Sequence, residues 1–120
     1  MTREEIMSME PGRELDRLVA LKVMGYEPSK MEPKLVRKGA VAFLPEPYSW
    51  NISAAWEVVE KMKQNNWFFI LSDNLFSDNW EASFFWEPNQ EMVDSISKSA
   101  PEAICKAALL AVLAVLGEEE

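Results

Sequence analysis

A capped amphipathic helix followed at once by a very apolar segment is the feature that most limits how this chain can fold. Within residues 48–62, five apolar side chains recur at helical spacing and define one face: Ile52, Ala55, Trp56, Val59 and Met62. Ser49 or Asn51 is placed to accept hydrogen bonds from the amides of the first turn. Asn65-Asn66 is suited to end the helix in the left-handed backbone conformation, because asparagine tolerates positive φ. The pattern predicts a helix with one side in a core.

The segment Trp67–Ser72 is apolar at both odd and even positions, which predicts a strand covered on both faces. Turn-forming residues follow, and Trp80–Trp86 then alternates in part, so the two segments predict a hairpin. A third, more exposed strand is expected over Met92–Ser97, and a short edge strand over Ala40–Leu44. These segments together indicate an antiparallel sheet of three to four strands.

Three further helical segments complete an α+β fold. Thr2 and Glu5 have the spacing of a capping box, which predicts a short helical turn through Met9. A firmer helix is expected over Arg13–Met24, with Gly25 at its stop. The last helix, Pro101–Leu116, is apolar around its whole circumference beyond its first turn. It is either deeply buried within the domain or also covers a partner chain.

The length and composition favour one domain over residues 1–120, because 48% hydrophobic residues suffice for a core in a chain of this size. Glu118–Glu120 are expected to form a disordered acidic tail. The longest apolar run, Ala107–Leu116, is too short to span a bilayer, and the N-terminus lacks the pattern of a signal peptide. The single cysteine, Cys105, agrees with a reducing compartment and is expected to be a core residue. These observations predict a protein of the cytoplasm of the cell that makes it.

The net charge of −8 lies entirely in the second half of the chain. Residues 1–66 carry ten basic and ten acidic side chains, whereas residues 67–120 carry two basic and ten acidic ones. Such a field opposes contact with nucleic acid or anionic lipid and favours a basic partner, although it also simply keeps a small protein soluble. The acidic residues around the hairpin are the candidates for a partner-binding face: Asp73, Asp78, Glu81, Glu87, Glu91 and Asp94.

Residue types that usually act in catalysis, metal binding or phosphate binding are scarce. The chain has no histidine, one cysteine and only four glycines, and it contains no phosphate-binding glycine loop. Asp73 and Asp78 flank the hairpin loop, but their surroundings fit a turn better than a calcium site. The sequence therefore predicts a protein that is not an enzyme, with no catalytic, cofactor-binding or metal-binding residues.

Several segments carry a family resemblance. They include RELDRLVA over residues 13–20, Tyr48-Ser49, AAWEVVEKM over residues 54–62 and APEAICKAAL over residues 100–109. With these segments the chain resembles the phage ABA sandwich domain proteins of phages and prophages of Gram-positive bacteria. The resemblance implies a three-layer α-β-α sandwich with helices on both faces of the sheet. It implies no activity and assigns no catalytic residue.

Four functions follow as hypotheses. The leading one is a non-enzymatic phage or prophage accessory protein that binds a host or phage protein and inhibits a defence or replication component. A second is an acidic mimic of nucleic acid that blocks a DNA-binding enzyme. A third is a protein that sequesters a nucleotide signal under the proline-rich segment, through Lys34, Arg37 or Lys38. The fourth is a self-associating structural protein, with a homodimer formed through the helix Pro101–Leu116.

Overall fold

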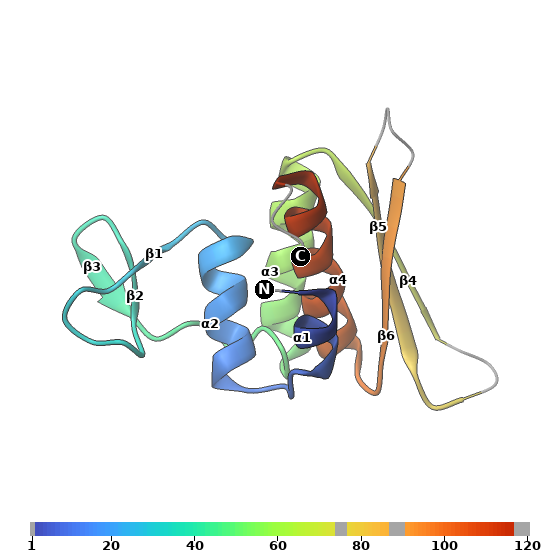
Figure 1. The fold of residues 1–120 in the computed structure, drawn as a ribbon, viewed down its shortest axis with the longest axis horizontal. Helices are drawn as coiled ribbons and strands as arrows, with labels where there is room; N and C mark the ends of the chain where they lie inside the picture. The colour runs from blue at the N-terminus through green and yellow to red at the C-terminus, as the bar shows by residue number, and fades with distance from the viewer. Residues whose placement is uncertain (1, 74–76, 87–90, 117–120) are drawn as a thin grey trace.

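The computed structural model describes residues 2–73, 77–86 and 91–116 of the chain. Within these residues the structure contains helices α1 (Arg3–Ser8), α2 (Arg13–Lys22), α3 (Ile52–Gln64) and α4 (Ala100–Leu116). The strands are β1 (Glu27–Pro28), β2 (Val36–Lys38), β3 (Val41–Phe43), β4 (Trp67–Asp73), β5 (Trp80–Trp86) and β6 (Glu91–Ser97). The helices occupy the middle of the molecule, with the larger sheet on one side and the small sheet at the opposite end (Figure 1). The α+β class is thereby confirmed.

The larger sheet is an antiparallel meander in the order β4-β5-β6. Its register sets Phe69 of β4 opposite Phe84 of β5, and Phe84 opposite Val93 of β6. These residues belong to the face that packs against the helices, and Phe84 at its centre is fully buried. The hairpin and the third strand expected over 92–97 are therefore confirmed.

The helix ends follow from local chemistry as predicted. Thr2 and Glu5 form the capping box of α1, and the hydrogen bond from the Thr2 amide lowers the pKa of Glu5. Asn51 caps α3 by accepting a hydrogen bond from the Ala54 amide at 3.1 Å. Gly25 after α2 and Asn66 after α3 adopt φ values of 83° and 71°. This left-handed conformation is the one that the sequence predicted at both stops.

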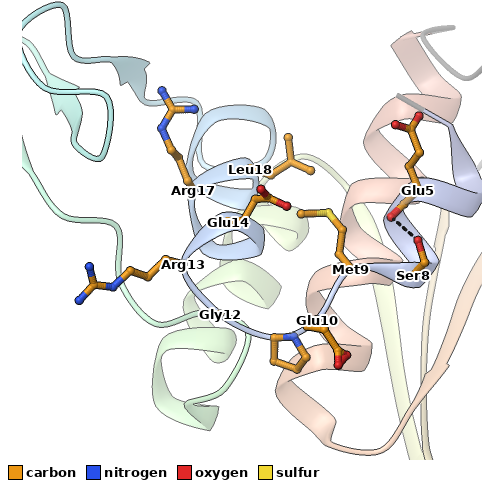
Figure 2. A pocket seen from close by; sticks show the side chains of 10 residues that line it. Glu5, Ser8, Met9, Glu10, Gly12, Arg13, Glu14, Arg17 and Leu18 are labelled. Carbon is orange, nitrogen blue, oxygen red and sulfur yellow. Dashed lines mark hydrogen bonds between the residues drawn. The ribbon is translucent and has the colours of Figure 1, made fainter.

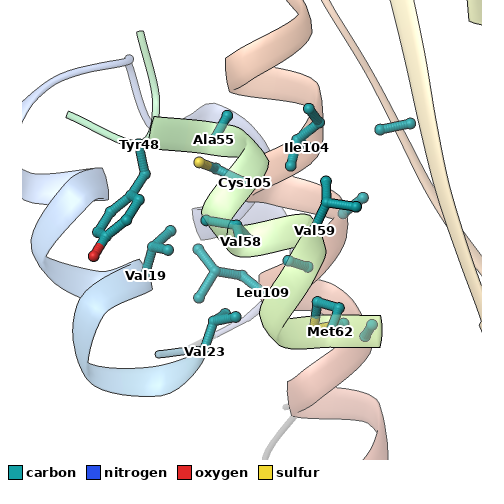
Figure 3. Close-up of a cluster of buried hydrophobic side chains, with 14 of the residues drawn as sticks. Val19, Val23, Tyr48, Ala55, Val58, Val59, Met62, Ile104, Cys105 and Leu109 are labelled. Carbon is teal, nitrogen blue, oxygen red and sulfur yellow. The ribbon is translucent and has the colours of Figure 1, made fainter. Parts of the chain in front are cut away.

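Helix α4 runs through the centre of the molecule, where it packs against β5 and β6 of the larger sheet and against α1, α2 and α3 (Figure 1). Every residue from Ala103 to Ala111 is buried. Ile104, Cys105 and Leu109 face α3 and α2 in one continuous cluster (Figure 3). Its apolar circumference is thus explained by burial within the chain, which was one of the two alternatives. Among the described helices, none is long and apolar enough to cross a membrane.

The core face of α3 is rotated slightly about the helix axis relative to the predicted one. Ala55, Val59 and Met62 are buried as expected, but Ile52 and Trp56 are half-exposed, and Ala54 and Val58 are buried instead. Trp56 lies at the border of this face, with its ring edge-to-face on Phe69 at 5.9 Å between centroids. The amphipathic spacing predicted the helix correctly but not the direction of its buried face, which depends on how α3 packs against α4 and β4.

The larger sheet is covered by described helices on one face only, which corrects the expectation of helices on both faces. Trp67, Phe69 and Leu71 of β4 point toward the helices, whereas Phe68 and Ile70 point away and are half-exposed. The opposite end of the molecule carries a small sheet in the order β1-β2-β3. The layers of the described chain are therefore sheet, helices and small sheet (Figure 1). Of the small sheet, only β3 was predicted.

Cys105 is a core residue, as predicted. Its side chain is fully buried among α2, α3 and α4, and burial raises the pKa of the thiol well above its usual value. We expect the native protein to leave a thiol reagent such as Ellman's reagent unreacted, and to consume one equivalent only when urea unfolds it. Rapid modification in the absence of denaturant would contradict this burial.

Candidate functional site

The face of the larger sheet that points away from the helices is the first candidate site, and we name it the outer sheet face. In register, its three rows are Phe68, Phe85 and Met92; Ile70, Ser83 and Asp94; and Ser72, Glu81 and Ile96. Strand alternation alone places these residues together, because every second side chain lies on the same side of a strand. The outer sheet face is thus built from all three strands.

Apolar side chains dominate this face. The exposed fractions of Phe68, Ile70, Met92 and Ile96 are 52%, 48%, 59% and 47%. The ring of Phe68 stacks on that of Phe85 across the strand pair, with centroids 5.3 Å apart. Single exposed apolar residues are ordinary, but a contiguous group spread over three strands is typical of a surface that another molecule covers.

A pair of carboxylates lies within the same face. Glu81 on β5 and Asp94 on β6 are diagonal neighbours across the strand pair, and no basic residue occupies any of the nine positions of the outer sheet face. A side-chain hydrogen bond with Asp94 raises the pKa of Glu81, and burial and the negative charge of Asp94 act in the same direction. The face therefore combines an apolar area with two adjacent acids.

Of the six acidic residues proposed as a binding face, the described structure brings only Glu81 and Asp94 together. Asp73 is exposed at the end of β4, and Asp78 is exposed in the connection that leads into β5. Glu87 and the side chain of Glu91 lie outside the described residues. In the part of the chain that is described, no three acidic or cysteine residues come close enough to hold a metal ion.

The acidic pair predicts a measurable stability effect. Because the folded state raises the pKa of Glu81 above its ordinary value of 4.5, the folded chain binds the proton more tightly than the unfolded chain. The contribution of Glu81 to the free energy of unfolding is therefore fully present below a pH of 4.5, and it is lost as the pH rises through the raised pKa of Glu81. We expect Glu81→Gln to raise the free energy of unfolding by roughly 0.2–1 kcal/mol at neutral pH and to change it little in acid.

Urea unfolding at neutral and acidic pH measures this effect, with Glu60→Gln on the exposed side of α3 as the matched control. The control is expected to show no comparable gain at neutral pH. A Glu81→Gln protein that is less stable than the wild type at neutral pH would contradict the repulsion between Glu81 and Asp94.

A cleft between α2 and the proline-rich segment is the second candidate site. It encloses about 410 Å³. Its walls combine Arg13, Glu14, Asp16 and Arg17 of α2 with Pro33, Lys34, Leu44, Pro45, Pro47 and Trp50. A more open hollow of about 720 Å³ lies between α1 and α2. Figure 2 shows that Arg13 and Arg17 extend from α2 away from Glu5 and Ser8 of α1.

The structure separates the three basic residues that the sequence proposed for a small ligand. Lys34 lines the cleft, whereas Arg37 forms an ion pair with Glu27 at 3.3 Å on the small sheet. Lys38 lies beside Trp56, over a different hollow. The arginines that do line the cleft, Arg13 and Arg17, were missed. Their spacing of one helical turn was visible in the sequence, but nothing in it indicated that the proline-rich segment folds back over α2.

The chain is similar to known phage proteins. The profile of the phage ABA sandwich domain matches residues 17–109. A crystal structure of a phage protein from Bacillus cereus ATCC 14579 is 28% identical in sequence, superposes with a TM-score of 0.71, and aligns over 85% of this chain and 91% of its own. No curated protein matches the chain. The family match spans most of the sequence and the fold agrees with it, so this chain belongs to the phage ABA sandwich domain family.

Proposed function

We propose that this phage protein acts without catalysis, by binding a host or phage protein through the outer sheet face. The observation that supports this most strongly is the exposure of Phe68, Ile70, Met92 and Ile96 on one face of a sheet whose other face packs against the helices. Apolar side chains at the centre of a patch supply most of the affinity in protein interfaces. A host defence or replication protein in the bacterial cytoplasm is the target class that we propose for a phage-encoded binder.

The charges of the outer sheet face indicate which partner would fit. Glu81 and Asp94 lie against each other with no basic residue on the face. A partner that presents lysine or arginine beside an apolar ridge would relieve their repulsion, so binding would gain from both features. A second copy of the same face would instead bring four carboxylates together. This charge argument favours a basic partner protein over self-association through this surface.

The same geometry makes mimicry of nucleic acid the weaker alternative. A mimic must present separate charges at the spacing of phosphates, whereas Glu81 and Asp94 are adjacent and lie among apolar side chains. Self-association through α4 is also weaker, because within the described residues its exposed apolar surface is confined to Ala114 and Val115 in the last turn. Both alternatives remain outcomes of the experiment below.

Affinity capture with variant baits tests the proposal. We expect Ile70→Thr/Ile96→Thr to weaken capture of the partner by about tenfold or more, since each residue would be a buried apolar contact in the complex. Threonine is a good strand residue, so the sheet is retained. The matched control is Val41→Thr on β3, which changes an even more exposed apolar side chain at the other end of the molecule.

The pattern of capture decides the outcome. A protein that binds the wild type and Val41→Thr but not the double variant supports the proposal. Equal capture by all three baits contradicts it, because the partner would then bind elsewhere. Capture that high salt abolishes and that the double variant leaves intact would instead support a charge mimic.

A further inference from the structure

The cleft between α2 and the proline-rich segment is separate from the outer sheet face and lies toward the opposite end of the molecule (Figure 1). Its volume of about 410 Å³ is in the range of sites that enclose small molecules. The apolar part of its wall consists of Pro33, Leu44, Pro45, Pro47 and Trp50. The volume and the apolar part of the lining suit a small molecule.

The wall is held in place before any ligand arrives. Ser49, next to Trp50, donates hydrogen bonds from its amide and its hydroxyl to Asp16 of α2, at 2.8 and 2.6 Å. The amides of Trp50 and Asn51 donate to the carbonyl oxygen of Pro47. The prolines further restrict the backbone. A preformed wall lowers the entropic cost of binding.

Trp50 offers an aromatic surface to this cleft. Its exposed fraction is 61%, which is high for the largest apolar side chain, and it lines the cleft beside Pro47. An indole at the edge of a cleft stacks well on a flat ring, and stacking on an aromatic residue is worth about 1–3 kcal/mol for a nucleic-acid base. The apolar wall thus favours a planar aromatic group.

The basic side chains favour an anion. Within the described residues, no ion pair involves Arg13, Arg17 or Lys34, and the Nε atom of Arg17 is buried without a hydrogen-bond partner. Two carboxylates also line the cleft, Glu14 and Asp16, and Asp16 accepts hydrogen bonds from Ser49, so the basic residues of the lining exceed the acidic ones by one. Arginine binds phosphate oxygens through two parallel hydrogen bonds, so the guanidinium groups of Arg13 and Arg17 suit a phosphate group.

We propose that this cleft binds a small molecule in which an aromatic ring carries a phosphate group, of about the size of a nucleoside monophosphate. The ring stacks on Trp50 and the prolines, and the phosphate meets Arg13, Arg17 and Lys34. A nucleic-acid strand does not fit, because the net charge of −8 opposes a long polyanion. This inference is independent of the proposed protein-binding function.

Isothermal titration of the intact chain with AMP, GMP, CMP and UMP tests the proposal, with adenosine and inorganic phosphate as the separate halves of the ligand. We expect at least one monophosphate to bind, and each half alone to bind about tenfold more weakly or worse, since both groups contribute. Trp50→Ala and Arg13→Gln/Arg17→Gln should each weaken binding by about tenfold or more. The control is Arg3→Gln, which removes an exposed charge on α1.

Three outcomes would overturn the proposal. The first is no binding of any of the four monophosphates at millimolar concentration. The second is binding that Arg3→Gln weakens as much as Arg13→Gln/Arg17→Gln, which would indicate general charge attraction. The third is a proline-rich peptide that binds in a manner dependent on Trp50 when the nucleotides do not. Far-ultraviolet circular dichroism of each variant confirms that the change is local, and exposed Trp50 permits its removal without loss of the fold.

Discussion

Replacing Asp16 with alanine is expected to lower the free energy of unfolding by about 2–4 kcal/mol. One carboxylate oxygen of Asp16 accepts hydrogen bonds from both the amide and the hydroxyl of Ser49, and the Ser49 hydroxyl in turn accepts from the Gly12 amide at 2.9 Å. Asp16 and Ser49 are buried. Alanine would leave the Ser49 amide without an acceptor where water cannot replace it, and an unsatisfied buried group costs more than a lost bond.

A graded series checks this expectation. Asp16→Asn keeps one acceptor and should lose less stability than alanine, while Glu14→Ala, an exposed neighbour on α2, should change it by less than about 0.5 kcal/mol. Urea unfolding measures all three. A loss of less than about 1 kcal/mol for Asp16→Ala would contradict the role of this contact in joining α2 to the start of α3.

Replacing Lys106 with alanine is the second large effect, expected at about 2–4 kcal/mol. The side chain of Lys106 is 4% exposed, and its Nζ donates to Glu102 Oε2 at 2.7 Å and to the Met7 carbonyl oxygen at 2.9 Å. The pair therefore ties α1 to α4. Removing the lysine leaves the Glu102 carboxylate, which is itself only 14% exposed, without its cation.

Two further variants separate the sources of this loss. Lys106→Met retains most of the buried methylene volume, so the difference in stability between Lys106→Met and Lys106→Ala measures the contribution of packing. Glu102→Gln/Lys106→Met also removes the unpaired charge, and we expect it to be more stable than Lys106→Met alone. Amide hydrogen exchange should show faster exchange in α1 for Lys106→Ala than for the wild type. Unchanged exchange in α1 together with unchanged stability would contradict the role of Lys106 in holding α1 against α4.

Local chemistry in the sequence was sufficient to predict most helix ends and strands. The Asn51 cap, the positive φ of Gly25 and the hairpin between β4 and β5 depend on neighbouring residues and were predicted correctly. Ser49 shows where this reasoning stops. It was a candidate cap for α3, but its hydroxyl bonds Asp16, which is far away in the sequence. Only the folded chain reveals such a partner.

The hydrophobicity of the strands could not show which faces of the larger sheet are covered by helices. Phe68 and Ile70 are as apolar as Phe69 and Leu71, so the composition of β4 indicated two buried faces. The alternation of burial arises because the helices cover only one side. An apolar strand face with no cover and an apolar strand face in a core have the same sequence pattern. The difference is visible only in the structure, and it is what identifies the outer sheet face.

The candidate sites were predicted only in part. Glu81 and Asp94 were among the acidic residues singled out, but their apolar neighbours Met92 and Ile96 were assigned no role in binding. Lys34 was singled out for a ligand without Arg13 and Arg17. In both cases the missing residues come from elements that only the sheet register or the folded loop brings together.

A methyl NMR titration of the labelled chain with the captured partner distinguishes binding at the outer sheet face from binding elsewhere. We expect the methyl signals of Ile70, Met92 and Ile96 to shift or broaden on binding, because these side chains become covered by the partner. The signals of Met31 and Val41, which are more exposed and lie at the small-sheet end, should stay unchanged. Shifts confined to Met31 and Val41, with the outer sheet face unaffected, would contradict the account.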